Sequence, residues 1–536
     1  MDDSALSRRA FLRQGALSVL GASTLAGCGS SNSAPASTSK STAASATGST
    51  SITTASSARA SGPPTAADWA HLEHELSGRL VLPKSASYAA AKLVYDLRFD
   101  SARPAAIAYC ATPADVQRTI DFARRHAITP TPRCGGHSYA GYSTGSGLIV
   151  DVTSMNRVVV SGPTARVDAG TRLIDLYSAV ASEGVLVPGG SCPTVGIAGL
   201  ALGGGVGVLG RKYGLTADAI EEVTIVTADA RVLRVDPTTE ADLYWACRGG
   251  GGGNFGVVTS FHLATHPIPP LALFTLEFPW AAAGDLFHAW THWIARAPDE
   301  LWSNCLLLSA GAGGLVARST GVYVGETSSL TGLVNELVAA VGAAPTTNFV
   351  GADSYLRAMF VEAACAELTL AQCQLSAPAS AGMLARTAFA AKSAYFAKTP
   401  PHAGIAAITS AVEHFHSELP ELGGGLAFDG LGGAINAVAP DATAFVHRDS
   451  LCQLQMTGSW GSDTDSSTAA AVHRWLAQTA SSLASYTNGE AYQNYIDPTL
   501  ADWQHAYYGR NLHRLRSIRR RYDPDAVFDF AQAIPV

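Results

Sequence analysis

The stretch "PRCGGHSYAGYS" (132–143) places a single histidine, His137, between a Gly-Gly pair and Ser-Tyr. Glycine lacks a Cβ, so backbone at such a bend can come very close to a bulky group. Two more glycine-rich segments follow, "GGSCPTVGIAGLALGGGVG" (189–207) and "RGGGGGNFGVV" (248–258). Segments of this kind expose successive backbone N–H groups, which bind a diphosphate without many cations. Together the three segments predict a site for a long, charged dinucleotide such as FAD.

Two other motifs compete for the same glycines. "GYSTG" (141–145) matches the G-x-S-x-G nucleophile elbow, with Ser143 as nucleophile, but that elbow needs a helix after the turn. Here the strand-like "LIVDV" (148–152) follows, which disfavours a serine hydrolase. "GVGVLG" (205–210) matches G-x-G-x-x-G, yet "GIAGLALGG" precedes it instead of a β-branched strand. The match is therefore a weak indication of a Rossmann NAD site.

The periodicity of residues 99–269 predicts alternating short strands and helices. "TPADVQRTIDFARRHA" (112–127) begins with a capping box of Thr112 and Asp115 around Pro113, which predicts a helix start. Residues 147–152, 157–160 and 166–170 have the character of strands, and a helix capped by Thr171 is expected to end at Gly184. "EEVTIVTADARVLRV" (221–235) predicts a hairpin. We expect an α+β fold.

Longer strand-like runs mark a second part, residues 270–485. In "CQLQMTGSW" (452–460), apolar residues alternate with Gln453, Gln455 and Thr457, which predicts a strand with one polar face. That face either lines a cavity or faces water. A last segment, residues 486–536, is rich in tyrosine and ends in the basic "GRNLHRLRSIRRRYDPD" (509–525).

The N-terminus predicts export. "SRRAFLR" (7–13) resembles a twin-arginine signal, and "LAGC" (25–28) resembles a lipobox that would make Cys28 the lipidated first residue of the mature protein. The alternative is a plain alanine-rich signal with a chance cysteine. Residues 29–66 are mainly Ser, Thr, Ala, Pro and Gly, a composition typical of a flexible linker. We expect residues 1–28 to be the signal and the protein to be anchored by lipid outside the cytoplasmic membrane.

Taken together, the glycine segments and the C-terminal "NYIDPTLADWQHAYYGRNLHRLRSIRRRYDPDAVF" (494–528) resemble the berberine-bridge-enzyme-like flavin oxidases. These belong to the vanillyl-alcohol-oxidase-type flavoproteins. The resemblance implies a two-subdomain PCMH-type FAD-binding domain at 99–269. It also implies a substrate domain at 270–485 with an antiparallel sheet and flanking helices, and a C-terminal segment (486–536) that returns to the FAD domain.

In that family the motif histidine, here His137, is bonded through a ring nitrogen to the flavin 8α-methyl. The motif cysteine, here Cys192, can bond to flavin C6, so the resemblance implies bicovalent FAD. The alternatives are a loop histidine satisfied by backbone and a small buried thiol. The other positions that the resemblance assigns to the cofactor are Arg133, Gly135, Gly136, Ser138, Ser143, Val195, Gly196, Gly199, Gly203, Gly204, Gly205, Gly253, Asn254, Gly256, Val257, Val258 and Asn494.

The resemblance also implies the chemistry, transfer of a hydride from a hydroxyl-bearing carbon to flavin N5 while a base removes the hydroxyl proton. Tyr495 matches the family's active-site tyrosine, and Tyr139 a second one; both could instead be packed aromatics. A phenol has a pKa near 10 and needs nearby charge to act at neutral pH, for which Lys392 is a candidate. Gln453 and Gln455 suit a hydroxyl-rich ligand such as a sugar.

One valine bears on the identity of the base and another on the electron acceptor. Val206 stands where plant members carry a tyrosine, which leaves Tyr495 as the expected base. Valine at the position of Val195 is associated in the family with access of O₂ to the reduced flavin, so we expect an oxidase that releases H₂O₂. A dehydrogenase with another acceptor, or a lipid-anchored binding protein with a vestigial flavin fold, are the alternatives.

Net charge and cysteine content limit the other partners and ligands. The net charge of −7 argues against nucleic acid, which needs a basic surface. The nine cysteines contain no CxxC pair, so we expect no metal site. Cys365 and Cys373 could form a disulfide in an exported protein. We expect a monomer whose partners are a small-molecule substrate and O₂, with membrane contact only through the lipid anchor.

Overall fold

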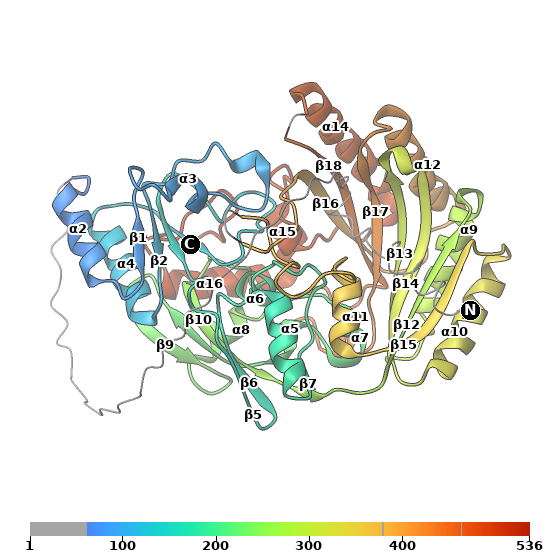
Figure 1. The fold of residues 1–536 in the computed structure, drawn as a ribbon, viewed down its shortest axis with the longest axis horizontal. Coiled ribbons are helices and arrows are strands. Elements are labelled where there is room, and N and C mark those ends of the chain that lie inside the picture. The colour runs from blue at the N-terminus through green and yellow to red at the C-terminus, as the bar shows by residue number, and fades with distance from the viewer. Residues whose placement is uncertain (1–61, 378–379, 463) are drawn as a thin grey trace, which may run out of the picture.

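The computed structural model describes residues 62–377, 380–462 and 464–536. The predicted signal, the predicted lipidation site Cys28 and nearly all of the predicted linker lie outside these residues. Within the described ranges, no helix is long and apolar enough to cross a membrane. Two lobes are visible in Figure 1, one built around two small sheets and one around a single large sheet.

The first lobe contains a four-stranded and a five-stranded sheet. The order in the first is β1-β2-β4-β3, with parallel pairing of β2 with β4 and of β3 with β4. The second is antiparallel, in the order β5-β6-β10-β8-β9. The strands are β1 (Arg79–Val81), β2 (Ala106–Tyr109), β3 (Pro130–Arg133), β4 (Leu148–Asp151), β5 (Val158–Ser161), β6 (Thr164–Asp168), β8 (Ile220–Val226), β9 (Val232–Val235) and β10 (Val257–Ala264), with β7 (Val185–Leu186) paired to β11 (His266–Pro267).

Short helices cover these sheets. They are α2 (Ala66–Glu75), α3 (Tyr88–Ala91), α4 (Pro113–Arg125), α5 (Leu173–Ser182), α6 (Ile197–Leu202), α7 (Gly210–Tyr213) and α8 (Ala241–Ala246). The predicted capping box is confirmed at α4, where Thr112 accepts from the Asp115 amide and Asp115 from that of Thr112. The predicted cap at α5 is wrong: Arg172 is the N-cap, because the Thr171 hydroxyl donates to the Asp168 carbonyl instead.

The lobe begins earlier in the chain than residue 99. Strand β1 pairs with β2, and α2 packs beside α4. Helix α2 has its own capping box, in which Thr65 and Asp68 bond each other's backbone amides. Helix α2 therefore begins at the end of the predicted linker.

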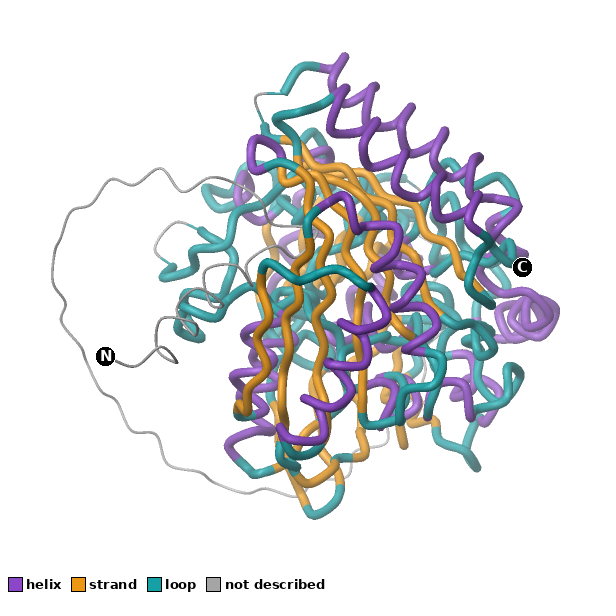
Figure 2. Tube along the Cα trace, turned by 90° about the vertical axis from the view of Figure 1, so that its right-hand side faces the viewer, coloured by secondary structure: helices purple, strands orange, loops and turns teal. Residues whose placement is uncertain are grey.

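The second lobe is a seven-stranded antiparallel sheet in the order β15-β12-β14-β13-β17-β18-β16. Its strands are β12 (Leu271–Phe278), β13 (Leu301–Ala310), β14 (Leu315–Val324), β15 (Thr347–Asp353), β16 (Ala388–Phe396), β17 (Gly423–Gly430) and β18 (Cys452–Trp460). Four helices cover one face, as Figure 2 shows: α9 (Ala283–Ile294), α10 (Thr327–Val341), α12 (His402–Glu418) and α14 (Ser466–Leu483). Leu454 and Met456 of β18 point into this helix-covered core, so Gln453 and Gln455 point to the other face.

That other face meets the first lobe. The contact is completed by α11 (Tyr355–Glu362), α13 (Ala434–Ala437), α15 (Trp503–Tyr508) and α16 (Leu512–Tyr522). In Figure 1 the C-terminal α16 lies within the first lobe, beside α8. Arg519 donates to the Asn254 side-chain oxygen at 3.1 Å, and the amide of Ile534 donates to the same atom at 2.9 Å. The last segment of the chain is thereby tied to the third glycine loop.

Candidate functional site

A cavity of about 610 Å³ lies between the glycine loops and the polar face of the large sheet. This volume is typical of cofactor and small-molecule sites. Of the residues predicted from sequence, the cavity wall includes Arg133, Gly135, Gly136, His137, Ser138, Tyr139, Ser143, Cys192, Val195, Gly196, Gly199, Gly253, Asn254, Gly256, Val257, Val258, Gln455, Asn494 and Tyr495. Segments far apart in the chain are thus brought to one site.

The glycines of the first loop are required by close backbone contact. A Cβ on Gly135 would lie 2.4 Å from the amide nitrogen of Gly196, which no side chain could accommodate. Gly136 has φ +72° and Gly253 φ +76°, a region that favours glycine. The loops therefore present backbone rather than side chains to the cavity, as a diphosphate requires.

Three predicted cofactor glycines do not line the cavity. Gly203, Gly204 and Gly205 lie behind it, where added Cβ atoms would meet the side chains of Asn494, Phe445 and Thr216 at 1.9, 2.6 and 2.5 Å. The Gly205 amide donates to the Tyr492 hydroxyl at 3.0 Å, and the Gly203 carbonyl accepts from Gln493 at 3.1 Å. These glycines make room for the C-terminal segment and are not part of the cavity wall.

Ser143 lies in an irregular loop on the cavity wall, with β4 following. No helix opens after it, so the nucleophile elbow is absent. The G-x-G-x-x-G stretch runs from the end of α6 into α7, with no strand before it. Neither competing motif has the surroundings that its chemistry needs.

His137 is held by two neighbours. Its Nε2 is 2.9 Å from the Thr194 hydroxyl, and its ring stacks on Tyr95 with 4.2 Å between centroids. Burial, assisted by the positive charge of Arg172, lowers the pKa of His137 to about 3. The imidazole is therefore neutral at physiological pH and keeps a lone pair. Because Nε2 faces Thr194, Nδ1 is the nitrogen that remains for a ligand.

Cys192 lines the same cavity as a free thiol. Burial raises its pKa to about 11, so the thiol is neutral at physiological pH. It lies close enough for its charge to affect the pKa values of Tyr95, Tyr139 and Tyr495. The imidazole, the thiol and the predicted catalytic tyrosines therefore share one end of the cavity.

Tyr139 and Tyr495 stack with 5.3 Å between ring centroids and 9° between planes. Tyr495 stands in the 3₁₀ turn η6 (Gln493–Tyr495), and Tyr139 follows the histidine loop. The Gln455 amide donates to the Tyr139 hydroxyl at 2.8 Å. Burial, followed by the tyrosines' charge on each other, raises the pKa of Tyr495 well above its ordinary value. Burial also raises the pKa of Tyr139, so neither tyrosine ionises readily at neutral pH.

Two acidic residues on the cavity wall were not predicted from the sequence. Asp429 of β17 and Glu362 at the end of α11 both line the cavity. Burial raises the pKa of Asp429 to about 6. Burial, with the charge of Asp429, raises the pKa of Glu362 to about 8. A carboxyl in the otherwise apolar "GGLAFDGLGG" (424–433) was the available signal for Asp429, because a buried strand rarely carries one without a purpose.

Lys392 and Gln453 lie elsewhere than predicted. Lys392 donates to the Asp497 carboxylate at 2.6 Å and to the Thr499 hydroxyl at 2.6 Å, and it does not line the cavity. The main causes of the raised pKa of Tyr495 do not include Lys392, so this geometry gives its predicted role no support. Gln453 is fully buried beyond the cavity wall.

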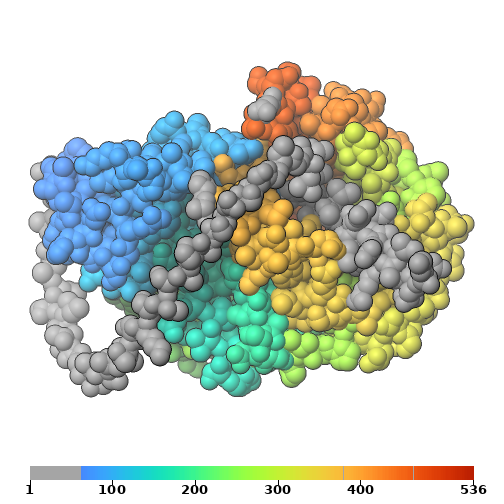
Figure 3. Space-filling view, viewed as in Figure 1, coloured from blue at the N-terminus to red at the C-terminus, as the bar shows by residue number. Residues whose placement is uncertain are grey.

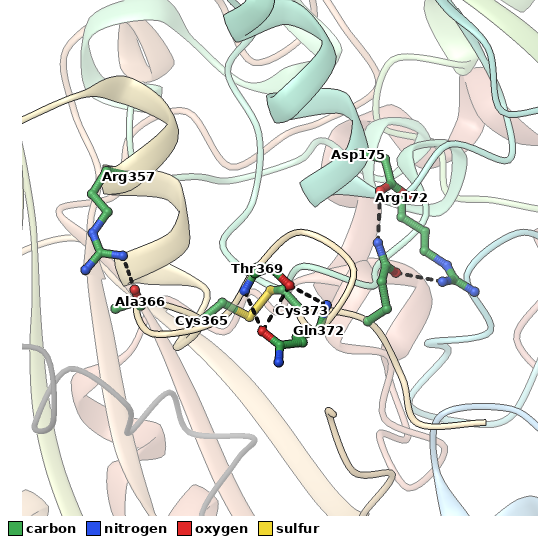
Figure 4. Close-up of a disulfide and its surroundings, with 9 residues drawn as sticks. Arg172, Asp175, Arg357, Cys365, Ala366, Thr369, Gln372 and Cys373 are labelled. Atoms are coloured by element: carbon green, nitrogen blue, oxygen red, sulfur yellow. Dashed lines mark hydrogen bonds between the residues drawn. A yellow bond between two sulfur atoms is a disulfide. The ribbon is translucent and has the colours of Figure 1, made fainter. Parts of the chain in front are cut away.

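A disulfide loop connects the two lobes beside the site. Cys365 and Cys373 form the predicted disulfide, drawn in Figure 4 with its surroundings. Just after it, Gln374 accepts from Arg172 at 2.7 Å and donates to Asp175 of α5 at 2.9 Å. Figure 3 shows this gold segment on the surface between the α5 region and the large sheet. The loop thereby holds α11, which carries Glu362, against the first lobe.

The residues present fit FAD. The cavity is lined with close-packed glycine backbone along one wall, and a neutral imidazole and a thiol stand at the end where the tyrosines meet. His137, Cys192 and the three glycine loops would hold the cofactor, whose isoalloxazine supplies a two-electron acceptor. Asn254 lines the cavity, and its amide oxygen also accepts from Arg519 and from the Ile534 amide.

Comparison with known proteins agrees with this geometry. The FAD binding domain family matches residues 104–236, and the family described as "Berberine and berberine like" matches residues 491–535. The FAD-linked oxidoreductase YgaK of Bacillus subtilis is 30% identical over 468 residues, which are 86% of this chain and 97% of that protein. Xylooligosaccharide oxidase of Thermothelomyces thermophilus is 28% identical over 454 residues, covering 80% and 87% of the two chains.

A solved structure has the same architecture. Physcomitrella patens BBE-like 1 superposes with a TM-score of 0.78 at 31% identity, covering 87% of this chain and 99% of that one. The similarity thus includes both lobes and the C-terminal return. The chain belongs to the berberine-bridge-enzyme-like family of FAD-linked oxidoreductases.

Proposed function

We propose that this FAD-linked oxidoreductase oxidises a hydroxyl-bearing carbon of a carbohydrate or related polyol and passes the electrons to O₂, giving H₂O₂. The observation that carries the proposal is the polar wall facing the Tyr139–Tyr495 stack. Thr275, Thr320, Asn304, Asp429 and Gln455 line it, each from a different strand of the large sheet. Hydroxyl-rich ligands need such a dense set of donors and acceptors. The xylooligosaccharide oxidase relative also supports this substrate class.

The proton step is assigned to Asp429 with Tyr495. The raised pKa of Tyr495 makes its phenol a poor base, whereas the Asp429 carboxyl, with a pKa raised to about 6, is ionised at neutral pH and still basic. Asp429 is near enough for its charge to raise the pKa of Tyr495. Tyr495 would orient the substrate hydroxyl, and Asp429 would accept its proton. The bound cofactor supplies the hydride acceptor.

Bicovalent attachment of FAD is part of the proposal. The neutral His137 ring leaves Nδ1 available, and the Cys192 thiol stands in the same cavity. Two links would keep the cofactor in an exported protein and raise its potential. O₂ as acceptor is supported by Val195, a small side chain on the cavity wall.

We also propose that the protein works outside the cytoplasmic membrane as a lipid-anchored monomer. The supports are the twin-arginine-like "SRRAFLR", the "LAGC" with Cys28, and a long linker rich in small residues. Partners would be the small-molecule substrate and O₂, with no nucleic acid. Membrane fractionation of cells expressing the full chain and its Cys28→Ala variant tests the anchor, since the variant should move to the soluble fraction.

A panel of mono- and oligosaccharides, scored for H₂O₂ under air and for flavin bleaching without air, tests the activity. Bleaching with rapid peroxide formation on readmission of air supports an oxidase. Bleaching followed by very slow reoxidation would instead identify a dehydrogenase. No bleaching by any sugar, with bleaching by another class of alcohol, would overturn the proposed substrate class. Asp429→Asn, loaded with FAD, is the matched inactive control.

A further inference from the structure

A row of polar side chains begins at the cavity wall and runs across the large sheet, away from the cavity. Asp429 of β17 pairs in register with Gln453 of β18, and Gln453 pairs with Tyr395 of β16. Residues directly opposite on neighbouring strands point to the same face, with Cβ atoms about 5 Å apart. Asp429 lines the cavity, whereas Gln453 and Tyr395 do not and are fully buried. The row therefore leads from the site into the protein.

The row continues to the surface through a histidine. The Tyr395 ring stacks on His447 with 4.4 Å between centroids, and His447 Nδ1 is 2.9 Å from the Glu490 carboxylate. His447 is fully buried, but the Glu490 side chain is 27% exposed. Asn488 also donates to Glu490 at 2.9 Å and fixes its position. The residues thus extend from the cavity to solvent.

Four buried polar atoms along this row have no hydrogen-bond partner among the described residues. They are the Tyr395 hydroxyl, His447 Nε2, and both the nitrogen and the oxygen of the Gln453 amide. Buried polar groups in proteins are nearly always bonded to protein or to ordered water. Such waters typically make about three hydrogen bonds to groups of this kind. Four such atoms on three neighbouring residues of the row therefore indicate that ordered waters lie between them. We call Gln453, Tyr395 and His447 with these waters the seam.

We propose that Tyr395, His447 and ordered waters, held in place by the Gln453 amide, form a proton path from Asp429 to Glu490. The inference rests on the proposed function. In turnover the substrate O–H bond breaks and its proton adds to Asp429, while the electrons of the C–H bond leave as hydride to the bound FAD. The proton then moves through the seam to Glu490 and to bulk water. Each carrier gives up one proton as it receives one, and Asp429 returns to its carboxylate.

The position of the seam explains why a path is needed. A bound substrate or product fills the cavity in front of Asp429, so the proton has to leave from behind. The groups that act on Tyr395 from the surrounding elements are Tyr492, Glu490, Arg448 and Asp429. The charge of Arg448 is engaged by Asp218, to which it donates at 2.7 and 2.8 Å. Each end of the seam therefore adjoins a carboxylate, Asp429 at the cavity and Glu490 near the surface.

The first test needs no turnover. A high-resolution crystal structure of the FAD-loaded protein should show ordered waters bonded to the Tyr395 hydroxyl, His447 Nε2 and the Gln453 amide. A seam without water, with these atoms bonded directly to other protein groups, would overturn the proposal. Tyr395→Phe should lose the water at that hydroxyl and keep the backbone unchanged.

The second test follows the proton in a single turnover, with a pH indicator in weak buffer. Tyr395→Phe and Glu490→Gln should slow proton release about tenfold or more, as expected for a lost proton carrier, while the first flavin reduction stays near wild type. Small buffers at high concentration should rescue Glu490→Gln. Thr457→Val is the control, because the Thr457 hydroxyl is buried and unpartnered on the same strand face outside the row.

Unchanged proton release in both variants would also overturn the path. Equal slowing in Thr457→Val would show that general loosening of the sheet is the cause and would likewise reject it. If no hydroxyl compound reduces the flavin, the proposed function fails, whereas the crystallographic waters decide the seam by themselves. The two failures are therefore distinguishable.

Discussion

The side-chain amide of Gln455 donates a hydrogen bond of 2.8 Å to the hydroxyl of Tyr139. Gln455 stands on β18 of the large sheet, and Tyr139 lies two residues after His137 in the first lobe. This bond therefore joins the polar wall of the cavity to the loop that carries His137. It also fixes the phenol ring that stacks on Tyr495.

Removal of this amide should disturb substrate binding more than it disturbs the fold. Gln455→Leu leaves the buried Tyr139 hydroxyl without its partner, at a cost of about 1–3 kcal/mol. We expect a higher KM with a smaller change in kcat, measured by steady-state peroxide formation. Tyr139→Phe and the double variant complete a thermodynamic cycle, and fully additive effects would show that the bond contributes nothing.

The pH dependence of kcat/KM should be bell-shaped. Asp429, with a pKa raised to about 6, has to lose its proton to act as base, so the rate rises with pH through that value. Glu362, with a pKa raised to about 8, donates a hydrogen bond to substrate only while protonated, so the rate falls above that value. Glu362→Gln keeps a donor and should lose the alkaline fall. Retention of the fall in this variant would assign it to another group.

Glu362 should also make stability depend on pH. Its pKa is raised from 4.5 to about 8, so between these values the folded protein keeps a proton that the unfolded chain releases. Stability therefore falls as pH rises through this window, by at most about 1.4 kcal/mol per pH unit. In Glu362→Gln the fall in Tm between the acidic and alkaline ends of the window should be smaller. Parallel Tm profiles would contradict the burial of this carboxyl.

Flavin that is covalently attached should stay with the protein after acid denaturation. Wild-type protein should give a yellow pellet and a colourless supernatant. His137→Ala and Cys192→Ala should each keep some flavin in the pellet through the other link, and the double variant should release all of it. Mass spectrometry of tryptic peptides checks each link. Unmodified masses for both peptides in fully loaded protein would reject the bicovalent proposal.

The disulfide should stabilise the loop that positions Glu362. Cys365 and Cys373 are separated by 8 residues in sequence, for which loop closure predicts about 2–3 kcal/mol. Cys365→Ala/Cys373→Ala should lower Tm and raise KM with little effect on flavin content. Reduction of wild type with dithiothreitol should reproduce both effects, and the paired variant should not respond to it.

Local patterns were sufficient for part of the fold. The capping box at Thr112, the hairpin of β8 and β9, and the alternation along β18 depend on neighbouring residues, so a sequence contains them in full. The predicted cap at Thr171 was wrong because the Thr171 hydroxyl donates to the Asp168 carbonyl in the preceding turn. The glycine segments indicated a cofactor site because backbone that has to approach a bulky group closely leaves few alternatives to glycine.

The sequence by itself indicated the cofactor class and the loops that line the cavity, because the segments that carry His137, Cys192 and the glycines are contiguous motifs. Only the tertiary structure decided that Gly203, Gly204 and Gly205 serve the C-terminal segment, and that Lys392 pairs with Asp497. It alone brought Asp429 and Glu362 to the cavity. The reason is physical: the large sheet aligns residues in register from strands more than a hundred positions apart, and no local pattern contains that register.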